Sequence, residues 1–166
     1  MSNVDNNLQQ LFHDAFGRVA APVGIVGVCD EEGHVHGMTA TAISSLSNDP
    51  PSLVALVNNE NQTSRTILER GQFCISYLKF ESEAIALRLS RPGQSKTLEA
   101  HELVQPEGWP VPVLRNASVT MMCELETALP QYTHQILVGR ITHVHIGDGP
   151  ADPLLYLQRA FHRLAA

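Results

Sequence analysis

A series of short apolar runs, each ended by residues that favour turns, constrains the fold of this chain more than any other feature. Residues 23–29, 53–57 and 73–78 have the length and composition of buried strands. Residues 30–33 read Asp-Glu-Glu-Gly, which is a turn sequence. The pattern therefore predicts a hairpin in which residues 34–43 form the returning strand. Closely spaced strands joined by turns indicate an antiparallel sheet, and this series favours a small barrel.

Longer strands are predicted in the C-terminal half. Residues 117–127 alternate between apolar and polar side chains near their end, which is typical of a half-buried strand. Residues 135–146 lose this alternation around Gly139-Arg140, where we expect a bulge or a bend. A last short strand is predicted at residues 154–157.

The chain opens with an amphipathic helix. Its apolar residues recur at helical spacing: Leu8, Leu11, Phe12, Ala15, Phe16 and Val19. Such a stripe has to pack on another surface, and the helix is expected to stop before Pro22. Residues 1–7 are expected to form a flexible tail in front of it.

Length, charge and composition exclude several classes of protein. The 166 residues are typical of one domain, residues 1–166. The net charge is −6, whereas nucleic-acid-binding domains carry a basic patch. No apolar run reaches the roughly 18 residues of a membrane-spanning helix, and the N-terminus lacks the features of a secretory signal. Three cysteines, far apart in apolar runs, indicate buried free thiols. We therefore expect a cytoplasmic protein without nucleic-acid or membrane partners.

Motifs of several enzyme classes are absent. The sequence contains neither of the glycine-rich phosphate loops, no G-x-S-x-G and no H-E-x-x-H. Two H-x-H pairs, His34 with His36 and His143 with His145, could each present two metal ligands on one face of a strand. Because no acidic or cysteine ligand follows at metal spacing, solvated strand faces explain both pairs better.

Two segments could hold a ligand. Residues 37–47 are small or carry hydroxyls, so a flat ligand could approach their backbone. A strand packed under a helix explains the same composition equally well. Residues 61–66 begin a short predicted helix that Gly71 ends, with Asn61 or Thr63 as the N-cap. A helix N-terminus with hydroxyls and an arginine favours an anion, although a capping segment with a solvated Arg65 has the same pattern.

The irregular segment 90–112 is a third candidate. It holds the only tryptophan, Trp109, and long connections in a small domain are often functional. Its first residues, Ser90 and Arg91, follow a predicted helix and offer a further cation. An ordinary basic residue at the end of a helix explains Arg91 at least as well.

Taken together, these segments resemble one family. The run GMTATAISSLSNDPPSLVALV is similar to the signature of the short-chain flavin reductases, which are the reductase components of two-component flavin monooxygenases. The resemblance is strongest to the branch that serves 4-hydroxyphenylacetate 3-monooxygenase. Further similar segments follow in the family's order over residues 10–164: FGRVAAPVGIV, NQT, PVLRNA, TH before VGRI, and PLLY with FH.

The resemblance implies a mainly β fold, namely an antiparallel Greek-key split β-barrel with a few flanking helices. It implies a homodimer that binds FMN or FAD and receives hydride from NADH or NADPH. The reduced flavin would then reach a partner flavin-dependent monooxygenase. An alternative is a flavoprotein of the same barrel class that carries electrons or reduces another acceptor, such as a corrin or a ferric chelate. A metal-binding barrel that uses the H-x-H pairs is a further alternative.

The resemblance also implies roles for individual residues. The isoalloxazine would be lined by four consecutive residues with a fifth nearby: Thr39, Ala40, Thr41, Ala42 and Ser45. The ribityl phosphate would be contacted by two further groups: Asn61, Gln62 and Thr63, with Ser90 and Arg91 close by. His134 and Phe161 would face the nicotinamide, with His134 as the catalytic residue that orients it or delivers a proton.

The sequence departs from the family pattern at three places. Tyr132 and Thr133 replace the glycine and aspartate of G-D-H, and the bulk of Tyr132 could change the reach to the nicotinamide. Asn61 stands where serine is usual. The pair Ala21-Pro22 replaces T-G after the first helix, next to the expected flavin site.

Overall fold

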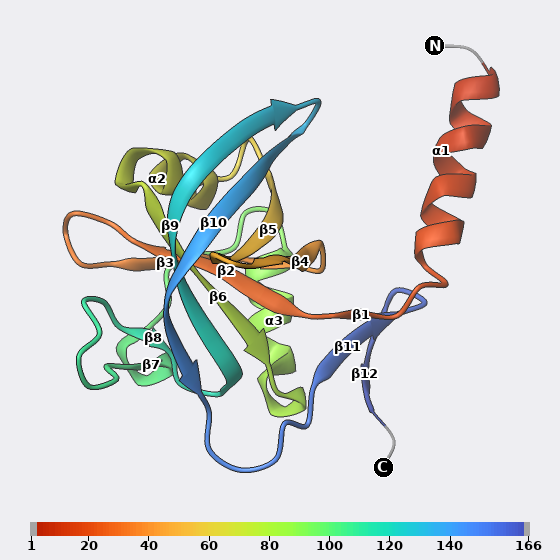
Figure 1. Ribbon diagram of the computed structural model, residues 1–166. Coiled ribbons are helices and arrows are strands. Elements are labelled where there is room, and N and C mark those ends of the chain that lie inside the picture. The colour runs from red at the N-terminus through yellow and green to blue at the C-terminus, as the bar shows by residue number, and fades with distance from the viewer. Residues whose placement is uncertain (1–2, 165–166) are drawn as a thin grey trace.

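Within residues 3–164, the part of the chain that this computed structural model describes, seven strands form one antiparallel sheet (Figure 1). In sheet order the strands are β3 (Val35–Ala40), β2 (Gly24–Cys29), β6 (Gln72–Leu78), β9 (Ala117–Gln131), β10 (His134–Ile146), β5 (Pro51–Asn58) and β4 (Ile43–Asn48). Each neighbouring pair is antiparallel.

Smaller elements flank this sheet. A three-stranded sheet joins β1 (Ala21–Pro22), β11 (Leu154–Leu157) and β12 (Ala160–Arg163), and a second pairs β7 (Leu103–Val104) with β8 (Val113–Leu114). The helices are α1 (Asn3–Phe16), α2 (Gln62–Arg70) and α3 (Glu83–Ser90), with 3₁₀ turns at Phe80–Ser82 and Ala100–Glu102. None of the helices within the described residues is both long and apolar enough to cross a membrane.

The two edge strands of the large sheet follow one another directly in the chain. β3 ends at Ala40 and β4 begins at Ile43, so Thr41 and Ala42 alone cross from one edge to the other. The sheet therefore has to curl until its edges approach, which gives a barrel whose wall is interrupted at this crossing. We refer to residues 39–42 as the seam. The prediction of a mainly β split barrel is confirmed, but one strand over residues 34–43 is wrong because the chain changes edges after Ala40.

Side chains from both halves of the sheet fill the barrel. Val26, Ala55, Val57, Ile75 and Leu137 have no exposed surface, and they belong to one continuous apolar cluster. Burial of apolar surface on this scale is the main force that holds the curled sheet closed.

The expected irregularity in β10 is present. The register between β9 and β10 shifts between Val138 and Gly139. A Cβ atom at Gly139 would lie 2.5 Å from Cζ of Phe73 and 2.8 Å from Cβ of Cys123. Only glycine therefore lets the aromatic ring of Phe73 pack against this strand. The residue at the bulge thus also determines how the core packs.

Helix α2 has the two ends that its sequence indicates. The side-chain oxygen of Asn61 accepts a hydrogen bond from the Thr63 amide at 3.1 Å, so Asn61 is the N-cap. Gly71 adopts a φ of 65°, and its amide donates to the carbonyl of Ile67 at 2.9 Å. This left-handed cap ends the helix as glycine commonly does.

Helix α1 extends away from the barrel (Figure 1). The predicted helix is confirmed, but no part of the chain between residues 3 and 164 covers its apolar stripe. Leu8, Phe12 and Phe16 are 68%, 55% and 65% exposed. The helix starts at Asn3 and thus includes most of the predicted tail, residues 1–7, of which the first two lie outside the described residues.

Candidate functional site

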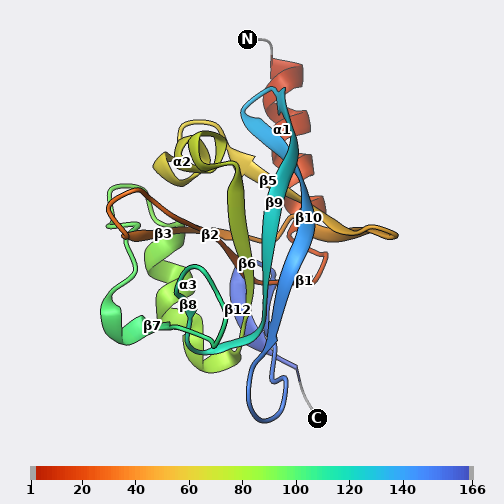
Figure 2. The same ribbon diagram turned by 60° about the vertical axis from the view of Figure 1, so that its left-hand side comes forward.

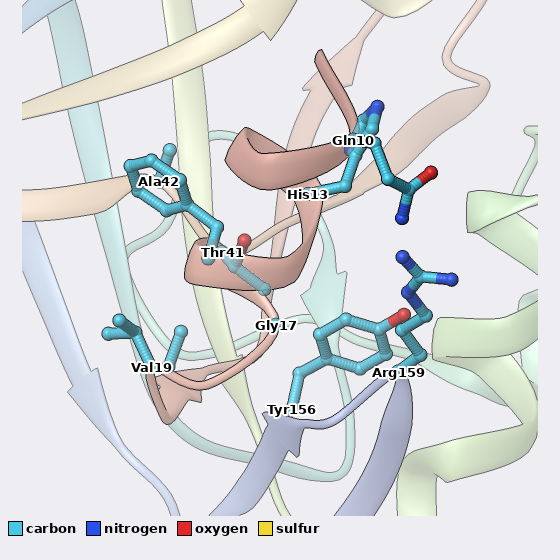
Figure 3. A pocket seen from close by; sticks show the side chains of 10 residues that line it. Gln10, His13, Gly17, Val19, Thr41, Ala42, Tyr156 and Arg159 are labelled. Carbon is cyan, nitrogen blue, oxygen red and sulfur yellow. The ribbon is translucent and has the colours of Figure 1, made fainter. Parts of the chain in front are cut away.

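Two adjacent cavities open at the seam. The larger has a volume of about 700 Å³ and lies between α1 and the seam, where Thr41 and Ala42 form part of its wall (Figure 3). The smaller has a volume of about 480 Å³ and reaches from the seam to α3. Both are lined by Thr41, Tyr156 and Arg159, so the two cavities share a wall at the turn of the β11–β12 hairpin.

Most of the small residues predicted to hold a flat ring lie here. Thr39, Ala40 and Thr41 line the smaller cavity together with Ser90 from α3 and Phe161 from β12. The hydroxyl of Thr39 donates to the carbonyl of Ala86 at 2.7 Å. This bond fixes the seam against α3, so the backbone of the seam is held in place while its small side chains leave the cavity open.

The β11–β12 hairpin supplies the aromatic wall. The rings of Tyr156 and Phe161 meet edge to face, with 5.4 Å between their centres. Residues Gln158 and Arg159 form the turn between them, and Arg159 enters both cavities. Arg159 was not predicted from the sequence, because no strand was predicted after residues 154–157 and the turn depends on the pairing of β11 with β12.

The first turn of α2 forms a polar site beyond the seam. The hydroxyl of Thr63 is fully buried and has no hydrogen-bond partner among the residues that the structure describes. Arg65 lies on the same turn, and its guanidinium donates to the carbonyl of Glu60 at 2.9 Å. An unpaired hydroxyl at a helix N-terminus is suited to an anion, because the backbone amides there carry partial positive charge.

A backbone hydrogen bond connects this site to the seam. The amide of Leu56 in β5 donates to the carbonyl of Ala42 at 2.9 Å, and β5 then continues to Asn58, three residues before Asn61. The seam therefore lies between the first turn of α2 and the β11–β12 hairpin.

His134 lies at the other end of the molecule from Phe161. It is the exposed first residue of β10 and pairs with Asn58 across the sheet. Its Nδ1 atom lies 2.8 Å from the hydroxyl of Thr133. Both overall views place the tip of the β9–β10 hairpin far from β12 (Figures 1 and 2). One chain therefore does not bring His134 and Phe161 to the same place.

The remaining predicted residues lie outside the two cavities. Ser45 is exposed on β4, where it pairs with Leu53. Arg91 is exposed after α3, and its carbonyl accepts a hydrogen bond from Lys96 at 2.8 Å. Neither residue lines the cavities at the seam, and neither do the three residues at the start of α2: Asn61, Gln62 and Thr63.

The H-x-H pairs have different surroundings from those predicted. His36 is buried, not solvated, and its Nε2 atom lies 2.8 Å from a carboxylate oxygen of Asp30. This hydrogen bond lowers the pKa of Asp30 to about 2. Alternation alone missed the pairing because Asp30 reaches back from the turn. Trp109 packs against the second pair, with 5.5 Å between its ring and that of His143.

Neither metal chemistry nor thiol chemistry is favoured by the described part of the chain. It contains no group of three or more His, Cys, Asp or Glu side chains that could hold a metal ion. All three cysteines are free, and Cys123 is fully buried while Cys29 and Cys74 are half-buried. Burial raises the pKa of Cys74 and of Cys123 to about 12, so neither supplies a thiolate near neutral pH.

Comparisons with known proteins agree on one family. Residues 16–165 match the family described as flavin reductase like domain. The chain is 30% identical over 153 residues to the NADH:riboflavin 5′-phosphate oxidoreductase of Streptomyces pristinaespiralis, covering 92% of this chain and 86% of that protein. It is 34% identical over 162 residues to the 4-hydroxyphenylacetate 3-monooxygenase reductase component of Thermus thermophilus, covering 95% and 97%. The NADH:FAD oxidoreductase of Streptomyces globisporus C-1027, solved with NAD and FAD fragments, has the same fold, with a TM-score of 0.83 at 20% identity over 99% of this chain and 96% of that one.

Proposed function

Because the chain belongs to the flavin reductase like domain family, we propose that it is an NAD(P)H:flavin oxidoreductase. It reduces FMN or FAD with NADH or NADPH and supplies the reduced flavin to a partner flavin-dependent monooxygenase. The observation that carries the proposal is the seam, where small residues open onto two adjacent cavities that share an aromatic wall.

The seam fits a flat, three-ring ligand. Ala40 and Ala42 present little more than backbone, so a ring can approach their amides and carbonyls closely. Tyr156 and Phe161 close the opposite side and limit the access of water. Such a site is mostly apolar with a few polar groups that fix orientation, as small-molecule sites usually are.

The first turn of α2 fits the phosphate that ends the ribityl chain. The hydroxyl of Thr63 is buried without a partner, which leaves a donor for a phosphate oxygen. Asn61 already caps the Thr63 amide, so we assign it to shaping the turn, with Gln62 and Arg65 exposed beside it. The position of the seam next to this turn supports one extended ligand that spans both.

The chain's own residues hold the two rings in position and exclude water; they supply no acid–base chemistry. When bound, the flavin supplies the redox chemistry, because its ring accepts a hydride from reduced nicotinamide. The seam holds one flat ring, and the cavity beside Phe161 leaves room for a second against it. Holding two rings in contact accounts for most of the acceleration such a site needs.

Two observations support a homodimer as the working form. The apolar stripe of α1 is exposed along its length, and a stripe of that kind is stable in water when a partner covers it. His134, proposed to orient the nicotinamide, begins β10 at the tip of the β9–β10 hairpin, and within one chain this tip lies far from β12, which holds Phe161. A second copy that packs along α1 could bring its own His134 to the seam, and it would cover the stripe at the same time.

NADH oxidation by the purified protein, with and without added FMN, tests the proposed activity. We expect turnover that rises with free FMN. Thr41→Trp, which fills the seam cavities, should abolish it, whereas Thr127→Trp at an exposed position of β9 should not. A yellow protein that oxidises neither NADH nor NADPH would instead indicate an electron carrier and would contradict the proposal.

A further inference from the structure

The turn between β11 and β12 holds two residues in a conformation that L-amino acids avoid. Leu157 pairs with Ala160, so Gln158 and Arg159 alone form the turn. Their φ angles are 50° and 63°. Two-residue turns of this kind usually contain glycine or asparagine, because a side chain in the left-handed region meets its own backbone. The sequence keeps two long side chains where a glycine would relieve strain.

Arg159 and Gln158 differ in their position relative to the cavities at the seam. Arg159 lines both cavities at the seam, whereas Gln158 lines neither of them. Figure 3 shows the guanidinium of Arg159 beside the ring of Tyr156 and turned towards α1. The other eight arginines and both lysines line neither cavity. Arg159 is therefore the cation of this site.

The guanidinium is available for an anion. Among the described residues it has one hydrogen-bond partner, a carboxylate oxygen of Asp14 at 3.3 Å. Both side chains of this pair are more than half exposed, so the ion pair is weak and easily exchanged. A guanidinium carries five donors in a planar fork, which matches two phosphate oxygens better than one distant carboxylate oxygen.

The position of Arg159 indicates which anionic group of the flavin or the dinucleotide it contacts. The flavin phosphate is assigned to the first turn of α2, and both overall views place α2 far from the β11–β12 hairpin (Figures 1 and 2). Arg159 instead lies two residues before Phe161 and on the same cavity, where the nicotinamide is assigned. The anion within its reach is the pyrophosphate that joins the two halves of the dinucleotide. The chain has a net charge of −6, so a local cation is needed to attract this ligand.

We propose that Arg159 binds the pyrophosphate of the nicotinamide dinucleotide and that the strained turn is kept to aim it. This inference rests on the proposed function and names the residue that recognises its anionic co-substrate. Residue 159 thus has two opposing requirements, because its left-handed backbone favours glycine whereas binding of the pyrophosphate requires the guanidinium.

Equilibrium binding of NADH and of FMN, measured on the purified protein without turnover, tests the proposal. Arg159→Gly should weaken NADH binding by about 10-fold, the usual loss for one charged hydrogen-bonding group, and should leave FMN binding within about 2-fold. Its melting temperature should be no lower than that of the unsubstituted protein, because glycine relieves the left-handed conformation. Arg159→Lys should bind NADH with intermediate affinity, since it keeps the charge but not the fork.

Gln158→Gly is the matched control, because it relieves the same kind of strain without removing the cation. It should keep its affinity for NADH and should melt no lower. Unchanged NADH binding by Arg159→Gly would overturn the proposal, and so would a loss confined to FMN or a lower melting temperature. A protein that binds no NADH even before substitution would overturn the proposed function itself, which is a different result from binding that is indifferent to Arg159.

Discussion

The barrel interior and helix α1 carry apolar residues with equally regular spacing, yet the two regions use them differently. In the barrel, Val26, Val57 and Ile75 are fully enclosed by other strands of the same chain. In α1, Leu8 and Phe16 are more than half exposed. Apolar periodicity thus predicts that a surface becomes buried, but it does not indicate whether the same chain or another chain buries it. One copy of the chain is sufficient to enclose the barrel interior, whereas the stripe of α1 is exposed and is the surface that we propose a second copy covers.

The same substitution in the two regions should have very different costs. Phe73→Ala removes a ring that is 1% exposed and packs against Gly139. It should lower the free energy of unfolding by about 3–5 kcal/mol. Phe12→Ala removes a ring that is 55% exposed, and at protein concentrations low enough for single chains it should cost less than about 1 kcal/mol. Urea unfolding of both variants measures the difference, and equal losses would contradict the contrast.

A charge on the stripe of α1 should act on association rather than on folding. Phe12→Glu places a carboxylate in the middle of the proposed interface and should raise the dimer dissociation constant by at least about 10-fold. The control Asn7→Glu adds the same charge to the same helix outside the stripe. Sedimentation velocity over a range of concentrations distinguishes them. A stable dimer in Phe12→Glu would show that another surface holds the copies together.

A smaller effect is expected at the hairpin of β2 and β3, where the buried His36 contacts a carboxylate instead of apolar side chains. The hydrogen bond from His36 keeps the pKa of Asp30 at about 2, below its ordinary value of 3.8. A lowered carboxyl pKa stabilises the folded state above pH 4, and this contribution is lost as the pH falls from about 4 to 2. Asp30→Asn should therefore flatten the decline of the free energy of unfolding over this interval.

Urea titrations at several pH values compare Asp30→Asn with Glu32→Gln. The control removes the same charge from the same turn, where Glu32 lies 3.5 Å from the exposed His34 and not against His36. It should keep the decline of the unsubstituted protein. Identical profiles for the two variants would show that the contact with His36 does not couple to folding.

Local signals in the sequence were sufficient for most of the barrel. The Asp-Glu-Glu-Gly turn predicted the first hairpin, Gly71 predicted the end of α2, and Gly139 predicted the irregularity in β10. The interruption of the barrel at Thr41 and Ala42 was not predicted, because it depends on two sheet edges that meet through long-range pairing. A small-residue strand and a crossing between edges have the same composition.

The candidate site was less predictable for the same reason. Thr39 and Phe161 are far apart in the sequence, and only the fold brings them to one cavity. Arg159 escaped notice because a turn with two left-handed residues indicates glycine, not a cation that lines a cavity. The separation of His134 from Phe161 also has no local signal, since it depends on the length and direction of the β9–β10 hairpin.

A crystal structure of the protein with FMN is the decisive test of whether the seam is the flavin site. We expect the flavin ring against residues 39–42, with its phosphate within hydrogen-bond distance of the Thr63 hydroxyl. A ring bound elsewhere, for example beside Trp109 and His143, would contradict this assignment.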